Sequence, residues 1–119
     1  MYSNFEMDGM RSSLQPLLEM RNTCGYAAAR NYRILSDELT EYDQRKREIM
    51  SEIGEHEIVD GKETGLLYVP NEKVGEYLER IKSYGEVRHS PQLMRIKWDD
   101  AIGVLSGNEM LTVQWMFEE

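Results

Sequence analysis

The stretch YRILSDELTEYDQRKREI, residues 32–49, decides the fold, because its apolar side chains recur with helical spacing. The pattern extends beyond both ends of the stretch at alternating intervals of four and three residues: Ala28, Tyr32, Leu35, Leu39, Tyr42, Lys46, Ile49 and Ile53. A heptad seam of this kind is typical of a helix that packs along its length against another helix. Gly54 follows where a helix commonly ends. The sequence therefore predicts one helix of about 29 residues, roughly 43 Å long.

A second helical pattern precedes the seam. Residues 6–20 carry apolar side chains at helical spacing, and Pro16 falls inside this pattern. A proline in a helix interior costs about 3 kcal/mol, so we expect a kink or a new start capped by Ser12 or Ser13. Antiparallel packing of this helix on the long one predicts a helical hairpin over residues 6–53.

The chain after Gly54 has shorter and more mixed elements. Short apolar runs around Asp60-Gly61 predict a β-hairpin or an ordered loop, and Asn71 is expected to cap a following helix. Residues 86–98 read as extended, with Met94, Ile96 and Trp98 on one side. For residues 109–117 the capping-box spacing of Ser106 and Glu109 favours a helix. The alternation of Val113, Trp115 and Phe117 also suits a strand.

These elements together predict an α+β fold that is mostly α. It would consist of an antiparallel helical hairpin with a long central helix, capped by a small β-hairpin and strand-plus-short-helix segment. A chain of 119 residues suits a single domain, with the helical hairpin at 6–53 and a small α/β cap at 55–119.

Composition and charge exclude several classes of protein. With 40% hydrophobic and 30% charged residues the chain belongs to the folded, soluble class. It has no apolar run near the ~18 residues of a membrane span, and MYSNFEMDGM does not resemble a secretory signal. The single cysteine, Cys24, cannot form an internal disulfide, which predicts a reducing cytoplasm.

The net charge of −8 falls almost entirely in the second part of the chain: residues 1–50 carry −1 and residues 51–119 carry −7. An acidic chain does not seek phosphate backbones, so direct nucleic-acid binding is not predicted. The acidic balance serves either solubility or the binding of a basic protein.

The residue types that carry chemistry are sparse. Cys24, His56 and His89 are the candidates for nucleophilic or acid–base catalysis, and no catalytic signature surrounds them. Glu52, Glu55, His56 and Glu57 form an acidic cluster that favours a solvated surface over a metal site, since Gly54 interrupts the helix they would share. The glycines never take the spacing of a phosphate loop. No catalytic residue, metal or cofactor is predicted, and the protein is not expected to be an enzyme.

Two groups of residues are predicted to bind a partner. Around the interruption of the seam at Lys46, Tyr42, Arg45 and Arg47 would face a partner if the core contacts of the seam ended near Tyr42. Otherwise Lys46 extends its charged end to solvent and the arginines pair with carboxylates. The second group is acidic: Glu72, Glu76, Glu79, Asp99 and Asp100. For Asp99 and Asp100 the alternative is a helix cap.

The run AARNYRILSDELTEYDQRKREIMSEIGE, residues 28–55, resembles a family of short phage and prophage proteins of unknown function with a long central charged helix. The matching positions extend over residues 24–82: Ala29-Arg30-Asn31, Leu35, Glu38-Leu39, Tyr42, Arg45 or Arg47, Gly54-Glu55 and Val69-Pro70. Ile53 stands where the family has an aromatic residue. The resemblance implies a phage or prophage gene acting in a bacterial cell or in a virion, and it implies no activity.

The predicted function is therefore that of a small, non-enzymatic, phage-encoded acidic protein that binds a host or phage protein in the bacterial cytoplasm. In its concrete version the protein inhibits a host defence nuclease or another nucleic-acid-binding host factor by competing for a basic channel. The alternative is a virion or assembly component that forms homo-oligomers through its helical seam.

Overall fold

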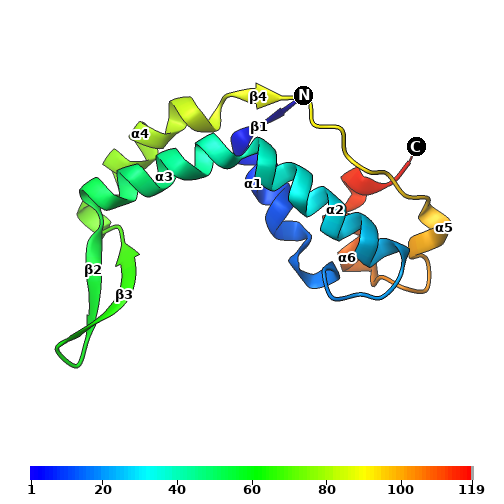
Figure 1. The fold of residues 1–119 in the computed structure, drawn as a ribbon, viewed down its shortest axis with the longest axis horizontal. Helices are drawn as coiled ribbons and strands as arrows, with labels where there is room; N and C mark the ends of the chain where they lie inside the picture. Colours follow the sequence, from blue (N-terminus) through cyan, green and yellow to red (C-terminus); the bar gives the residue numbers. More distant parts are fainter. Residues whose placement is uncertain (119) are drawn as a thin grey trace. The chain divides into compact units, whose positions relative to one another are not determined.

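The computed structural model describes residues 1–118 and consists mainly of helices, with two small antiparallel strand pairs (Figure 1). This confirms the predicted α+β, mostly α class. The elements follow in the order β1 (Tyr2–Ser3), α1 (Asn4–Ser13), η1 (Gln15–Leu17), α2 (Thr23–Glu38), α3 (Thr40–Ile53), β2 (Glu55–Val59), β3 (Lys62–Tyr68), η2 (Asn71–Lys73), α4 (Val74–Gly85), β4 (Arg88–His89), α5 (Trp98–Ala101), α6 (Gly107–Thr112) and η3 (Gln114–Met116).

Two helices, α2 and α3, replace the single long helix that was predicted, so its predicted length is wrong. α2 ends at Glu38 and α3 begins at Thr40, with Leu39 between them at φ −89° and ψ 2°. Thr40 is β-branched and a weaker helix former than most of its neighbours, and Glu41 and Asp43 lie in the first turn of α3, where carboxylates favour a helix start. The interruption therefore has a local cause in the sequence.

The chain separates into two compact units at the same place. Unit 1 comprises Met1–Leu39 and the chain from Arg88 onwards, and unit 2 comprises Thr40–Val87. These boundaries fall inside both the predicted hairpin (6–53) and the predicted cap (55–119). The single domain expected from the length stays a prediction. What the structure adds is that α2 and α3 have different packing partners.

In unit 1, α1 packs on α2, and the two helices run in roughly opposite directions (Figure 1). Their buried side chains include Met7, Leu14 and Leu35. Pro16 lies in η1, which begins after α1 has ended. Of the two expectations, a kink or a new start, the structure shows the new start. The expected cap of this new start is wrong, because Leu14 precedes η1 without a side-chain cap bond, and neither Ser12 nor Ser13 caps it.

The end of unit 1 combines a helix and an extended pairing. Ser106 caps α6 with the predicted capping box, which confirms the helical interpretation up to Thr112. Phe117 is extended and forms a parallel bridge with Ile96. Trp98 does not continue the extended segment as predicted, because it opens α5, and its ring stacks on Phe117 with centroids 4.3 Å apart.

Gly25 near the start of α2 allows a close approach of two backbone segments. A Cβ atom at this position would lie 1.9 Å from the carbonyl oxygen of Met20. Any other residue would have to displace the loop that connects η1 to α2.

In unit 2, α3 packs on α4, and β2 and β3 form the predicted hairpin. The buried hydrophobic side chains of these two helices are Tyr42, Ile49, Ile53 and Ile81. The hairpin turns at Asp60 (φ 52°) and Gly61 (φ 77°), as the Asp-Gly pair predicts. The expected cap of α4 is wrong: Asn71 lies in η2, and α4 starts at Val74 without a side-chain cap.

Candidate protein-interaction surfaces

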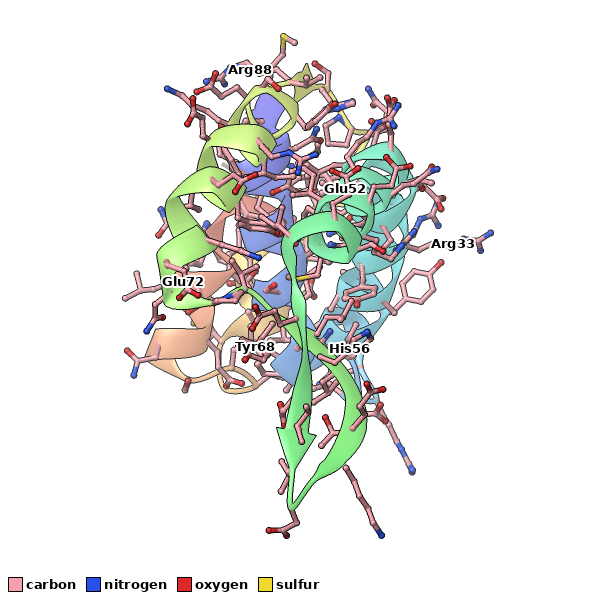
Figure 2. The ribbon with its side chains drawn as sticks, turned by 90° about the vertical axis from the view of Figure 1, so that its left-hand side faces the viewer. Arg33, Glu52, His56, Tyr68, Glu72 and Arg88 are labelled. Carbon is pink, nitrogen blue, oxygen red and sulfur yellow. The ribbon has the colours of Figure 1, made fainter. Side chains whose placement is uncertain are left out.

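The hairpin of β2 and β3 exposes large apolar side chains on both of its faces. Ile58 is 64% exposed and Leu66 is 61% exposed, and Val59, Leu67 and Tyr68 are also exposed. The hairpin projects from the end of α3, and its side chains point away from the ribbon on both sides (Figures 1 and 2). An isolated two-stranded hairpin is at best marginally stable in water, and contiguous apolar exposure commonly marks an interaction site.

The outer edges of this hairpin are also without strand partners. β2 and β3 pair only with each other, and within residues 1–118 no backbone hydrogen bond outside that pairing involves either strand. The pairing joins Glu55 to Tyr68, His56 to Leu67, Ile58 to Glu63 and Val59 to Lys62. Unpaired strand edges present rows of backbone donors and acceptors that another strand can use.

A shallow groove lies beside the base of the hairpin. Its volume is about 410 Å³, and it is lined by Asp43, Lys46, Arg47, Met50, Ser51, Leu67 and Tyr77. The groove extends the apolar surface of Leu67 on to α3 and α4. Among Tyr42, Arg45 and Arg47, which were predicted to bind a partner, Arg47 lies exposed in this groove.

Of the other two residues predicted to bind a partner here, Tyr42 is buried and Arg45 is paired within the protein. Tyr42 is buried, so the prediction that its ring faces a partner is wrong. The Nη1 atom of Arg45 lies 2.9 Å from Glu48 Oε2, and its guanidinium lies 5.8 Å from the centroid of the Tyr84 ring. The hydrogen bond to Glu48 raises the pKa of Arg45.

The seam does not end near Tyr42. Ile49 and Ile53 are buried further along α3. The ammonium of Lys46 lies 4.9 Å from the centroid of the Tyr42 ring, with its side chain only half-buried. This is the arrangement expected of a lysine that covers a seam with its stem and keeps its charge in water.

The predicted acidic residues fall into two sets. Glu72 in η2 and Glu76 and Glu79 in α4 are exposed and follow one another at helical spacing on the outer face of unit 2. Asp99 and Asp100 belong to unit 1. The structure therefore does not bring the five residues together within one unit.

Asp100 has a local role in unit 1. Its Oδ2 atom accepts a hydrogen bond from the backbone N–H of Lys97 at 3.3 Å, at the start of α5. This supports the helix-cap alternative for that residue, so it is removed from the candidate surface.

The three candidates for catalysis belong to three different elements, α2, β2 and β4. Cys24 is buried in α2 and its thiol donates to the carbonyl oxygen of Asp100 at 3.4 Å. Burial, followed by the charge of Asp100, raises the pKa of the Cys24 thiol, which disfavours the nucleophilic thiolate. His89 in β4 has its Nδ1 atom 3.0 Å from Glu38 Oε2, and His56 lies exposed on the hairpin (Figure 2).

The described residues form neither a metal-binding cluster nor a membrane-spanning helix. Residues 1–118 contain no group of three or more His, Cys, Asp or Glu side chains placed to hold a metal ion. Among the helices of this part of the chain, none combines the length and the apolar character needed to cross a membrane.

Comparisons with protein-family models, with curated proteins and with solved structures gave no match to this chain.

Proposed function

We propose that this protein acts by binding another protein, and that the binding surface is the hairpin of unit 2 together with the groove at its base. The observation that carries the proposal is the exposure of five large apolar side chains on a hairpin whose outer edges are unpaired. A surface of this kind is stabilised when a partner covers it.

The charge of unit 2 indicates the class of partner. Thr40–Val87 contains 12 Asp and Glu against 7 Lys and Arg, a net charge of −5. Glu72, Glu76 and Glu79 add an acidic helix face to the same unit. Such a field steers basic partners and repels acidic ones, so the proposed partner is a protein with a basic surface.

The biological setting of this proposal comes from the resemblance of residues 24–82 to phage and prophage proteins. It supports a non-enzymatic, phage-encoded protein in the cytoplasm of a bacterial host. A nucleic-acid-binding host protein fits the proposed partner, because its nucleic-acid channel is lined by Lys and Arg. Inhibition of a defence nuclease is the concrete form of this proposal.

The structure provides less support for oligomerisation through the helical seam. The seam residues Leu35, Leu39, Tyr42, Ile49 and Ile53 are all buried by the chain itself. A second copy could reach them only if the helices first separated.

The test is an affinity capture from bacterial lysate with the tagged full-length protein and two variants. Leu66→Asp changes the exposed hairpin, and Leu111→Asp makes the same substitution at a 70% exposed leucine of unit 1. We expect a basic protein to be recovered with the wild type and with Leu111→Asp, and to be lost with Leu66→Asp. High salt should weaken its recovery, because part of the attraction is electrostatic.

Light scattering of the purified protein completes the test. The proposal expects a particle near the chain mass of 14.0 kDa. Equal capture by all three proteins would contradict the proposed surface. A mass several times larger that falls to the monomer in Leu66→Asp would indicate self-assembly through the hairpin instead.

A further inference from the structure

We propose that the partner binds by strand addition: an extended segment with basic residues at alternate positions pairs with the outer edge of β2. This inference rests on the proposed function and specifies its mode and the chemistry of the partner. In this mode backbone hydrogen bonds supply affinity, and the side chains that flank the new strand supply specificity.

The sheet of this hairpin is incomplete. β2 and β3 form a sheet of two strands, with apolar side chains exposed on both faces. Three or more strands, or a packed face, are usually needed for a stable sheet. A third strand would pair the free backbone groups of one edge and cover Ile58 or Val59 at the same time.

The outer edge of β2 is better suited to pairing than that of β3. The register places Thr64, Gly65 and Leu66 of β3 opposite Glu57 alone, so the extra residues of the irregularity lie on β3. Gly65 has φ 85°, which breaks the extended geometry of that strand. The residues of β2 run from Glu55 to Val59 without a positive φ, which leaves the more regular edge for pairing.

The charges along β2 complement those of a basic strand. Because side chains alternate, Glu55, Glu57 and Val59 share one face, and His56 and Ile58 share the other. Neither Glu55 nor Glu57 has an ion-pair partner within residues 1–118; Glu55 only accepts a hydrogen bond of 3.4 Å from the Tyr68 hydroxyl. Opposite charges facing each other across neighbouring strands are favourable, and like charges are unfavourable.

This pattern also distinguishes a basic partner from a second copy of the chain. Pairing β2 with β2 of another molecule would bring two acidic edges together. An added strand with Lys or Arg opposite Glu55 and Glu57 would neutralise both. The edge is therefore open to a basic strand and protected against self-pairing.

The experiment titrates the full-length protein with synthetic peptides of about seven residues, the length of an ordinary strand. One peptide alternates Lys and Val, and its control alternates Glu and Val. Two further Lys-Val peptides carry N-methyl groups on one or the other set of alternating amides. Each set faces one edge of the extended peptide, so only one set can hydrogen-bond to β2.

We expect the Lys-Val peptide to bind at least about tenfold more tightly than the Glu-Val peptide. Methylation of one set of amides should remove this binding, and methylation of the other set should leave it within about twofold. Hydrogen exchange of the β2 amides should slow on binding. Equal tolerance of both methylated sets, or no binding of the Lys-Val peptide, would overturn strand addition.

Variants test the position of the added strand. Glu55→Lys combined with Glu57→Lys should reverse the preference towards the Glu-Val peptide. The matched control, Glu19→Lys combined with Glu118→Lys, makes the same change in net charge at two exposed positions of unit 1 and should keep the preference for Lys-Val. A reversal by this control pair would mean that net charge sets the preference and would overturn the assignment to β2.

The outcomes also separate this inference from the proposed function. If the peptides fail while lysate capture remains sensitive to Leu66→Asp, the hairpin binds a protein without strand addition. If capture is insensitive to Leu66→Asp as well, the proposed function itself is wrong.

Discussion

Unit 1 and unit 2 both contain helices, but they differ in how many hydrophobic side chains they bury and in how their helices are capped. Of the 19 buried hydrophobic residues within 1–118, four belong to unit 2, namely Tyr42, Ile49, Ile53 and Ile81. In unit 1, α1, α2 and α6 begin with side-chain caps from Ser3, Asn22 and Ser106. In unit 2, η2 and α4 begin without one, and both hairpin strands are exposed.

This difference shows how a small chain divides stability and binding between its parts. Unit 1 caps α1, α2 and α6 with side chains and contains most of the buried hydrophobic residues of the described chain. Unit 2 leaves apolar surface and strand edges open, which costs stability in the free protein and makes them accessible to a partner. Regions of low local stability are commonly those that bind or move.

The largest expected effect tests how few side chains hold unit 2 together. Ile81 is 2% exposed on α4, so Ile81→Ala should remove about 2–5 kcal/mol from the stability of the packing with α3. Hydrogen exchange should show lost protection across Thr40–Val87 and retained protection in α1 and α2. The control is Leu78→Ala on the same helix, at an exposed leucine, which should have little effect. Equal loss of protection in both units would contradict the separation.

The next effect tests a contact that holds unit 1 together. Asn31 is fully buried, and its Nδ2 atom donates to the carbonyl oxygen of Met94 at 2.9 Å while its Oδ1 atom accepts from the Met94 N–H at 2.6 Å. Asn31→Ala leaves both backbone groups unpaired and should cost about 2–4 kcal/mol in a denaturant titration, despite the better helix propensity of alanine. Asn108→Ala, at an exposed asparagine, should change stability far less. An equal cost at both positions would show that the Met94 contact is not important.

Much of this fold was predictable because it depends on local patterns. Helical spacing gave α2, α3 and α4, Asp60-Gly61 gave the hairpin turn, and Ser106 with Glu109 gave the start of α6. The break at Leu39 was missed, although Thr40, Glu41 and Asp43 carried a helix-start signal. The continuous heptad seam outweighed that signal, because the spacing of apolar residues does not show whether one partner or two will cover them.

The candidate site was less predictable because it depends on what remains uncovered. Leu66, Leu67 and Tyr68 have the composition of a core strand, and only the absence of a covering layer turns them into a surface. The prediction that Tyr42 faces a partner was wrong for the opposite reason. Its ring is covered by the protein itself, and the seam stays buried beyond it at Ile49 and Ile53. Asn31 lies within the stretch 28–55 singled out in the sequence, but its partner, Met94, is 63 residues away along the chain. Residue type alone cannot reveal such a contact.

A smaller effect tests the contrast in capping between the units. The Ser3 hydroxyl accepts from the Glu6 N–H at 3.1 Å, and the Glu6 carboxylate accepts from the Ser3 N–H at 3.1 Å. Ser3→Ala should reduce stability by about 1 kcal/mol. The matched change in unit 2, Asn71→Ala, removes a predicted cap that makes no side-chain cap bond in the structure and should cost less. A larger loss at Asn71 would reverse the contrast.

The smallest effect isolates the charge of Glu6 and should appear only as a dependence on pH. The hydrogen bond from the Ser3 backbone, followed by that from its side chain, lowers the pKa of Glu6 below its usual 4.5. A depressed folded-state pKa adds stability above the unfolded-state value, and this stability is lost as the pH falls through the folded-state pKa. Glu6→Gln retains an oxygen that can accept from the Ser3 N–H and removes only the charge. Unfolding measured from about pH 7 downwards should therefore show the wild type as the more stable protein at neutral pH, with the difference from Glu6→Gln shrinking below about pH 4. A difference that stays constant over this range would mean that the carboxylate stabilises α1 through its shape and not through its charge.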